Sequence, residues 1–404
     1  MSRPAVTNTV NSLPVLLLAL TIGAFAIGLD TFVVIGSLAE ISRSLAISID
    51  AAGWIISTYA FCYAVFAPLN AWLFRGWKRR NVLLLSTCIF TIGNLLCAIG
   101  LNFEMVILGR VVSAFGAAMF TPAATTLTTV LLPPERKGFA LSLIFGGMTV
   151  SQAVGVPVTS WIAEAFGWRY AFYFVTLFGL IALMLLTIIL SGISHASPQI
   201  KKQALQMDVP KVIYGLLSVT FMIVAAEFVV YSYLSVLLSD TKFGIIPVLP
   251  SVLFAYGVGA VVGNIATGYL TDRIGPANVL LGAILTQTGL LIALVTLRDN
   301  GPLVIGIGLL WGIVSYMYLV PIQHRLLSYA GKQSSIFLAI NSSIIYIGIG
   351  AGGWIGGLLL TRLGIPFLAI FTGIVGLSAL ASAVIVMRRP VNNSATGDAL
   401  SQVS

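Results

Sequence analysis

A few ionisable side chains lie inside the long apolar stretches of this 404-residue chain, chief among them Asp30, Arg110 and Glu227. Inside a bilayer, each such charge costs about 2.5–3.5 kcal/mol on insertion scales, so each needs a partner or a function. Burial in surroundings of low dielectric disfavours the ionised form of a carboxylate, so a carboxyl group there takes up a proton readily. We therefore expect Asp30 and Glu227 to be the candidates for proton coupling, and Arg110 to be a partner for one of them.

Asp30 lies late in the first apolar stretch and Arg110 early in the fourth. These two stretches run in opposite directions, so the two side chains fall at similar depth and a pairing between them is expected. Two interpretations remain open. The pair is either a permanent lock of the amino-terminal half, or a contact that opens when Asp30 takes up a proton.

Glu227 has only apolar neighbours along the chain, and Arg325 lies nearer the inner end of its own stretch. The residue types favour a proton carrier. The alternative is a protonated glutamic acid that is hydrogen-bonded to a neighbouring helix. A set of further residues is predicted to bind substrate: Tyr231, Gln323, Tyr59, Asn341 and Tyr233. Tyr231 lies one helical turn from Glu227, and Gln323 follows Pro321, where a helix break would free backbone groups. Taken singly, each of the five fits a packing residue as well.

The elements that must position these residues follow from the composition. Hydrophobic residues make up 58% of the chain and charged residues 8%, with a mean hydropathy of +1.04, which excludes a soluble globular domain. Apolar stretches recur near 13–36, 50–74, 82–101, 104–131, 138–163, 169–192, 211–239, 248–271, 277–297, 302–330, 334–360 and 365–387. Their length predicts an all-α polytopic membrane protein with twelve transmembrane helices.

Lys and Arg are distributed unevenly between the two sides of these spans. Of the 21, we place 14 on the side of the amino terminus, 5 on the opposite side and 2 within spans. The positive-inside rule then predicts a cytoplasmic membrane protein with both termini in the cytoplasm. This accounts for the net charge of +9 without nucleic acid. Three scattered Cys and two distant His predict no disulfide framework, no metal site and no cofactor.

An internal repeat relates the two halves of the chain at an offset of 197 residues. Asp30 falls on Glu227, Tyr59 on Tyr256, Asn81 on Asn278 and Gly167 on Gly364. We predict a six-helix bundle over 1–192, a cytoplasmic linker over 193–211 and a second six-helix bundle over 212–404, with a short cytoplasmic tail. Two parallel repeats of this kind are typical of transporters, whose site lies between the repeats near mid-membrane.

The sequence resembles the major facilitator superfamily, and within it the twelve-span drug:proton antiporters. Three stretches carry the resemblance: Leu29–Gly36 with Leu38–Ile41, Leu108–Arg110 with Gly116, and Gly146–Pro157 with Gly167–Arg169. Tyr231–Tyr233 and Gly348–Gly353 look like the branch of sugar, arabinose and purine-nucleoside efflux permeases. The resemblance implies a role for Arg110 in proton coupling and a gating role for Gly155 and Pro157.

The loop between the second and third spans departs from the family pattern. Arg75 stands where the family has an aspartate, whereas the second half keeps Asp272 and Arg273. These three residues are expected to gate the inner side, and the first half lacks the acid of the family's charge relay.

The resemblance implies a proton-driven exporter of a small neutral or weakly cationic solute, such as a sugar, nucleoside or drug, by alternating access. Its expected partners are the lipid bilayer, protons and a small-molecule substrate, and a monomer is usual for the family. A proton-coupled importer or facilitator on the same fold is the alternative. An intramembrane carboxylate-dyad enzyme is more remote, because no cluster of nucleophile, base or metal ligands is evident.

Overall fold

The computed structural model describes residues 7–131, 134–190, 211–244, 246, 248–330 and 334–388. Within these ranges, twelve helices are long and apolar enough to cross a membrane. No β-ladder occurs there, and the sole bridge joins Phe243 to Ile246. The prediction of an all-helical, twelve-span protein is confirmed.

The helices of the first half follow one another with short connections. They are α1 (Thr7–Phe32), α2 (Leu38–Ser44), α3 (Ile49–Leu73), α4 (Arg79–Ile99), α5 (Phe103–Leu131), α6 (Pro134–Val150), α7 (Val156–Phe166) and α8 (Trp168–Leu190). A π-helical turn, Ser151–Gly155, joins α6 to α7 within one span. Such turns widen the helix locally and are frequent at functional sites.

The second half repeats this order of elements. It consists of α9 (Lys211–Tyr231), α10 (Leu234–Leu237), α11 (Val248–Ile274), α12 (Pro276–Thr296), α13 (Gly301–Ser315), α14 (Leu319–Ala330), α15 (Ser334–Arg362) and α16 (Pro366–Met387). Of the predicted linker, 193–210 lies outside the described residues, and Lys211 is the first residue of α9. In both halves the first span ends in a turn and a short helix, α2 or α10.

The tenth span breaks at a different place from the one predicted. Residues 316–318 form a turn between α13 and α14, whereas Pro321 lies in the first turn of α14. Proline fits there because the N–H groups of a first helical turn have no partner within the helix. The prediction of a break at Pro321 was wrong by a few residues.

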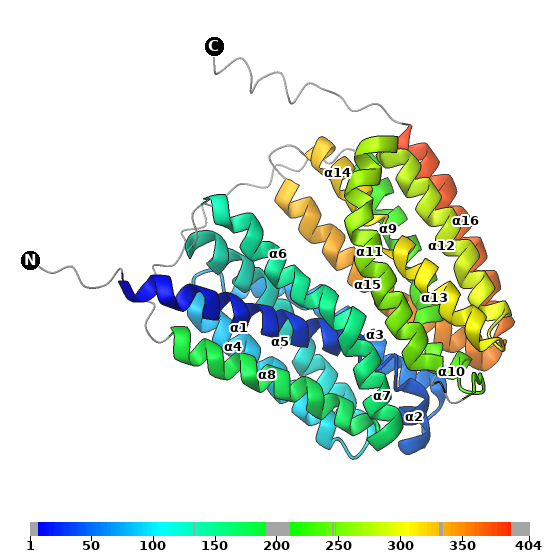
Figure 1. The fold of residues 1–404 in the computed structure, drawn as a ribbon, viewed down its shortest axis with the longest axis horizontal. Helices are drawn as coiled ribbons and strands as arrows, with labels where there is room; N and C mark the ends of the chain where they lie inside the picture. Colours follow the sequence, from blue (N-terminus) through cyan, green and yellow to red (C-terminus); the bar gives the residue numbers. More distant parts are fainter. Residues whose placement is uncertain are drawn as a thin grey trace, which may run out of the picture.

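The two bundles meet at one end of the molecule, which we call the convergent end and define by α2, α7 and α10. Towards the opposite, divergent end, where α1 begins and α16 ends, the ribbons of the two bundles separate (Figure 1). Between the bundles α3 packs against α15 and α11 against α7. Small residues permit this approach, since a Cβ on Gly257 would touch the backbone of Ala153.

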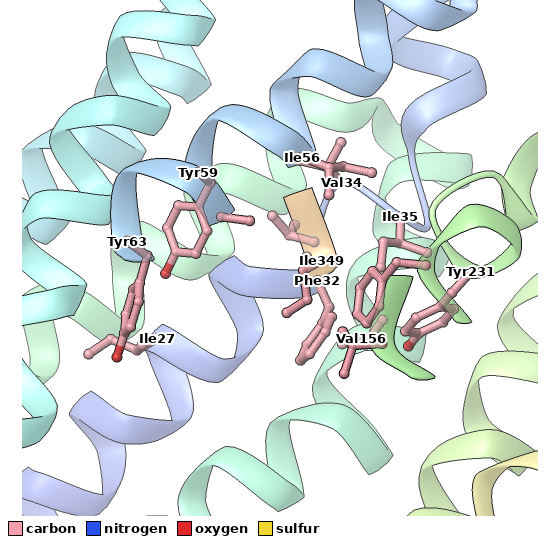
Figure 2. Close-up of a cluster of buried hydrophobic side chains, with 14 of the residues drawn as sticks. Ile27, Phe32, Val34, Ile35, Ile56, Tyr59, Tyr63, Val156, Tyr231 and Ile349 are labelled. Atoms are coloured by element: carbon pink, nitrogen blue, oxygen red, sulfur yellow. The ribbon is translucent and has the colours of Figure 1, made fainter. Parts of the chain in front are cut away.

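A buried apolar cluster fills the space between the bundles near the convergent end. Figure 2 shows Phe32 of α1 and Tyr231 of α9 within it, and their ring centroids are 6.1 Å apart. Tyr63 of α3 stacks on Tyr346 of α15 at 3.8 Å. Aromatic contacts therefore join the halves where the central spans cross.

Candidate functional site

Asp30 and Arg110 form an ion pair that is fully buried in the first bundle. Arg110 Nη1 lies 2.5 Å from Asp30 Oδ1, as the depth of the two residues predicted, and 3.1 Å from the Asp30 carbonyl oxygen. Arg110 Nε donates to the carbonyl of Ile55 at 3.2 Å, and the guanidinium carbon lies 4.1 Å from the ring centroid of Tyr59. Three helices, α1, α3 and α5, thus hold the cation in place.

Glu227 lies at the corresponding place in the second bundle and is 4% exposed. Its Oε1 accepts hydrogen bonds from three side chains: Ser315 Oγ at 2.9 Å, Trp311 Nε1 at 3.1 Å and the Tyr256 hydroxyl at 3.2 Å. Its Oε2 accepts one from Gln287 Nε2 at 3.3 Å. All four donors are neutral, and in the described part of the chain no ion pair includes Glu227.

The internal repeat shows how the two acids differ. Both sites contain the repeat-related tyrosine: Tyr59 packs on Arg110 in the first half, and Tyr256 donates to Glu227 in the second. At the offset of 197, however, Arg110 corresponds to Ile307. The second half therefore replaces one cation with several neutral hydrogen-bond donors.

A cavity of about 150 Å³ lies between the bundles beside Glu227. Its lining includes Thr31, Phe32 and Gln152 from the first half, and Glu227, Tyr316 and Tyr346 from the second. Across it, the Tyr316 hydroxyl donates to Gln152 Oε1 at 2.6 Å. Tyr316 belongs to the break between α13 and α14, and Gln152 to the π-helical turn. Aromatic faces, neutral polar groups and one acid give this cavity the character of a small-solute site.

The residues predicted to bind substrate lie outside the lining of this cavity. Tyr231 is buried behind it, with its ring 5.0 Å from that of Tyr256. The Tyr233 hydroxyl donates to the Gly353 carbonyl at 2.5 Å, near the convergent end. Asn341 Oδ1 accepts from Thr220 at 2.8 Å, between α15 and α9.

Gln323 is half-buried on α14, and Tyr59 packs on Arg110. For all five residues, substrate binding stays a prediction. Gln287, Trp311 and Ser315 were not predicted as partners of Glu227. The four-residue spacing of Trp311 and Ser315, which places both on one helix face, was the available signal.

The residues predicted to gate the inner side lie at the divergent end or along α6 and α7. Arg75, Asp272 and Arg273 are exposed, and no ion pair among the described residues includes them. Gly155 ends the π-helical turn, where a Cβ would touch Leu29 of α1, and Pro157 is buried in the first turn of α7. Their gating roles stay predictions.

A second, larger pocket of about 740 Å³ lies between the bundles at the convergent end. Glu40 of α2, outside the membrane spans, is part of its lining. Partial burial raises the pKa of this carboxyl, opposed by a hydrogen bond from the Trp168 backbone and by the charges of Arg43 and Arg169. Residues of both halves line this pocket, which lies beyond the ends of their first spans.

The family model described as Major Facilitator Superfamily matches residues 20–337. The chain belongs to this superfamily. Inner membrane transport protein YdhP of Escherichia coli K12 is 30% identical over 377 residues, covering 93% of this chain and 96% of YdhP. The uncharacterized MFS-type transporter YtbD of Bacillus subtilis 168 is 28% identical, covering 90% and 93% of the two chains.

Among solved structures, a crystal structure of a D-xylose–proton symporter has the same fold, with a TM-score of 0.74 over 94% of this chain and 98% of its own. Its sequence identity is 15%, so this likeness concerns the fold alone. As a member of the superfamily, the chain is a multi-pass membrane transporter and not an enzyme.

Proposed function

We propose that this transporter is a proton-coupled exporter of a small neutral or weakly cationic solute, and that Glu227 carries the coupling proton. One observation carries the proposal: a buried acid, held by neutral donors alone among its described contacts, lies in the wall of the cavity between the bundles. Buried acids within membrane spans mark ion and proton pathways.

Protonation has different consequences at the two acids. A proton on Asp30 would leave the Arg110 guanidinium buried without its counter-charge, at a cost of several kcal/mol. A proton on Glu227 removes a charge whose partners are neutral, and the carboxyl group can still hydrogen-bond to them. Glu227 is therefore the better candidate for repeated proton exchange, while Asp30 and Arg110 hold the first bundle together.

The direction of transport rests on orientation and on the resemblance of the fifth span to antiporters. We place the divergent end, where α1 begins and α16 ends, in the cytoplasm, because Lys and Arg concentrate on that side. Solute then enters from the cytoplasm, and the bundles rock about the cavity to release it outside. The D-xylose–proton symporter supports this use of the fold but neither the substrate nor the direction.

The proton gradient is sufficient for export. A membrane potential of 100 mV supplies about 2.3 kcal/mol per charge. One pH unit adds about 1.4 kcal/mol. Together these support a gradient of several hundredfold for a neutral solute moved against one proton.

The test uses proteoliposomes that contain the purified transporter and a pH-sensitive dye. Sugars, nucleosides and lipophilic cations are added in turn to the parent, to Glu227→Gln and to Asp30→Asn. We expect one solute class to move protons in the parent. Glu227→Gln should lose proton movement but keep the exchange of labelled for unlabelled solute, because exchange needs no proton. Glu104→Gln, which changes an exposed acid in the first turn of α5, is the matched control.

Each other outcome contradicts part of the proposal. Proton and solute movement in the same direction would indicate an importer. Coupling that persists in Glu227→Gln and disappears in Asp30→Asn would assign the proton to the first half. Solute movement without protons in the parent would make both acids structural.

A further inference from the structure

At the break in the tenth span, two successive residues donate hydrogen bonds to side chains on two different elements. Ser315, the last residue of α13, donates to Glu227 Oε1 at 2.9 Å within the second bundle. Tyr316, the next residue, donates to Gln152 of the first bundle at 2.6 Å. The backbone therefore links the environment of the acid directly to a hydrogen bond between the bundles.

The Ser315 hydroxyl has one hydrogen and two acceptors within reach. Glu227 Oε1 and the carbonyl oxygen of Trp311 both lie 2.9 Å from its oxygen. When Glu227 is ionised, the hydroxyl donates to the carboxylate. When Glu227 is protonated, the hydroxyl can accept from the acid and donate to the Trp311 carbonyl instead. The proton on Glu227 thus changes the hydrogen bonding of the last turn of α13.

On the opposite side, Gln152 belongs to the π-helical turn Ser151–Gly155. This turn packs closely on α11, where a Cβ on Gly257 would touch Ala153. Both ends of the Tyr316–Gln152 hydrogen bond therefore stand where the spans depart from regular α-helix. Sharp kinks in helices are found at such places.

We propose that Ser315 and Tyr316 are positioning residues that couple the proton on Glu227 to the hydrogen bond between the two bundles. The proposal rests on the proposed function, in which Glu227 carries the proton. In the ionised state Ser315 fixes the end of α13, so that Tyr316 reaches Gln152. Uptake of a proton releases Ser315 from the carboxylate, lets the turn at 316–318 shift and weakens the contact between the bundles.

In the part of the chain that the structure describes, the other titratable groups around Glu227 are phenols. They are Tyr231 on α9, Tyr256 on α11, Tyr316 and Tyr318 at the break, and Tyr346 on α15. Phenols ordinarily titrate near pH 10, above the range in which a transporter works. A response to mildly acidic buffer at this place is therefore expected to come from Glu227.

The experiment measures the proton on the acid and the arrangement of the bundles separately. The full chain carries Cys62→Ala, Cys88→Ala and Cys97→Ala, and spin labels are attached at Leu101→Cys and Asp299→Cys, in convergent-end loops of the two halves. Distances between the labels are recorded in lipid at mildly acidic and mildly alkaline pH. Infrared difference spectra of the same samples report the carboxylic-acid band that Glu227→Gln removes.

We expect the band and the distances to titrate together in the parent, and Glu227→Gln to keep the acidic distance distribution at both pH values. Ser315→Ala and Tyr316→Phe should keep the band but reduce the pH-dependent change in the population ratio about fivefold, the effect of one hydrogen bond. Gln152→Leu should do the same from the opposite bundle. Tyr214→Phe removes a hydroxyl from an exposed side chain of α9 and should behave as the parent.

The contradicting results separate the two proposals. If Ser315→Ala and Tyr316→Phe keep both the band and the full change in distance, the coupling role is overturned and the proposed function stands. If the distances in the parent do not respond while the band titrates, the coupling role is again overturned. If no band titrates in the parent, Glu227 is not the proton carrier and both proposals fail.

Discussion

At the scale of single residues, the two acids show two ways to bury a carboxylate in a membrane protein. Asp30 has the Arg110 guanidinium beside it in the same bundle, so its charge stays balanced when the two bundles change their relative orientation. Glu227 has Tyr256, Gln287, Trp311 and Ser315, which supply hydrogen bonds but no charge. The first arrangement favours permanence, and the second favours exchange of a proton.

Removing Arg110 tests the structural part of this difference. We expect Arg110→Gln to destabilise the protein by about 3–5 kcal/mol, because it leaves Asp30 buried without its counter-charge. The double change Arg110→Gln with Asp30→Asn should recover much of this loss, since both charges are then absent. Thermal unfolding in detergent measures the effect. A double variant less stable than Arg110→Gln would show that Asp30 is not the group left uncompensated.

At the scale of helices, α15 carries glycines on the side that faces α3. A Cβ on Gly350 would touch Phe61 of α3, and one on Gly353 would touch Ser57 of α3. A Cβ on Gly357 would meet Asp50 of α3 as well as Tyr233, which precedes α10. Gly53 of α3 also permits this close approach, because a Cβ there would overlap the Tyr233 hydroxyl. In membranes, small residues allow such close packing of helices.

A large side chain in place of a glycine at this contact between α3 and α15 should keep the two bundles apart at the convergent end. Ser57 is fully buried, so Ser57→Cys serves as the labelling site. We expect the additional change Gly53→Leu to expose this cysteine to a membrane-impermeant maleimide. An increase of about tenfold in labelling rate corresponds to about 1.4 kcal/mol less stability of the closed contact. Gly282→Leu is the matched control, because an added Cβ there meets no atom within 4 Å. Equal labelling in both variants would mean that the glycine contact does not control closure.

The sequence predicted the spans but not their interruptions. Hydropathy found all twelve, because a bilayer demands long apolar helices. The π-helical turn at Ser151–Gly155 and the break at 316–318 have no signature in apolar content, since both keep the span hydrophobic. Proline misled the prediction for the tenth span, because Pro321 begins a helix there and does not interrupt one.

The same limit applies to the candidate site. Asp30 and Arg110 could be paired from sequence because charges in spans are few and depth can be counted. The partners of Glu227 could not be predicted in this way. Gln287, Trp311 and Ser315 come from spans whose rotation about the helix axis is not fixed by the sequence. The internal repeat aligned Tyr256 with Tyr59, but its hydrogen bond to Glu227 was not predicted either.

At the scale of the whole molecule, orientation in the membrane decides which way solute moves. The ribbon places the start of α1 and the end of α16 at the divergent end, and the short connections place Gly76 there too. Leu101 lies in a loop at the convergent end and is 83% exposed. These two residues therefore report opposite faces of the protein.

We expect a membrane-impermeant maleimide to label Leu101→Cys in intact cells and to leave Gly76→Cys unlabelled until the cells are opened. Both positions are exposed, so a difference in labelling reflects sidedness and not burial. The measurement uses the background without native cysteines. The reverse pattern would place the termini outside and would overturn the proposed direction of export.

The unequal partners of the two acids have an electrical consequence. The Asp30–Arg110 pair adds no net charge to the central region, so its place in the transmembrane field does not change with the proton cycle. An ionised Glu227 adds one uncompensated negative charge there, and a protonated Glu227 adds none. If Glu227 carries the coupling proton and the solute is neutral, reorientation of the bundles is electrically silent in one protonation state and carries a transient current in the other, so the resting potential of the cell would bias only one half of the transport cycle.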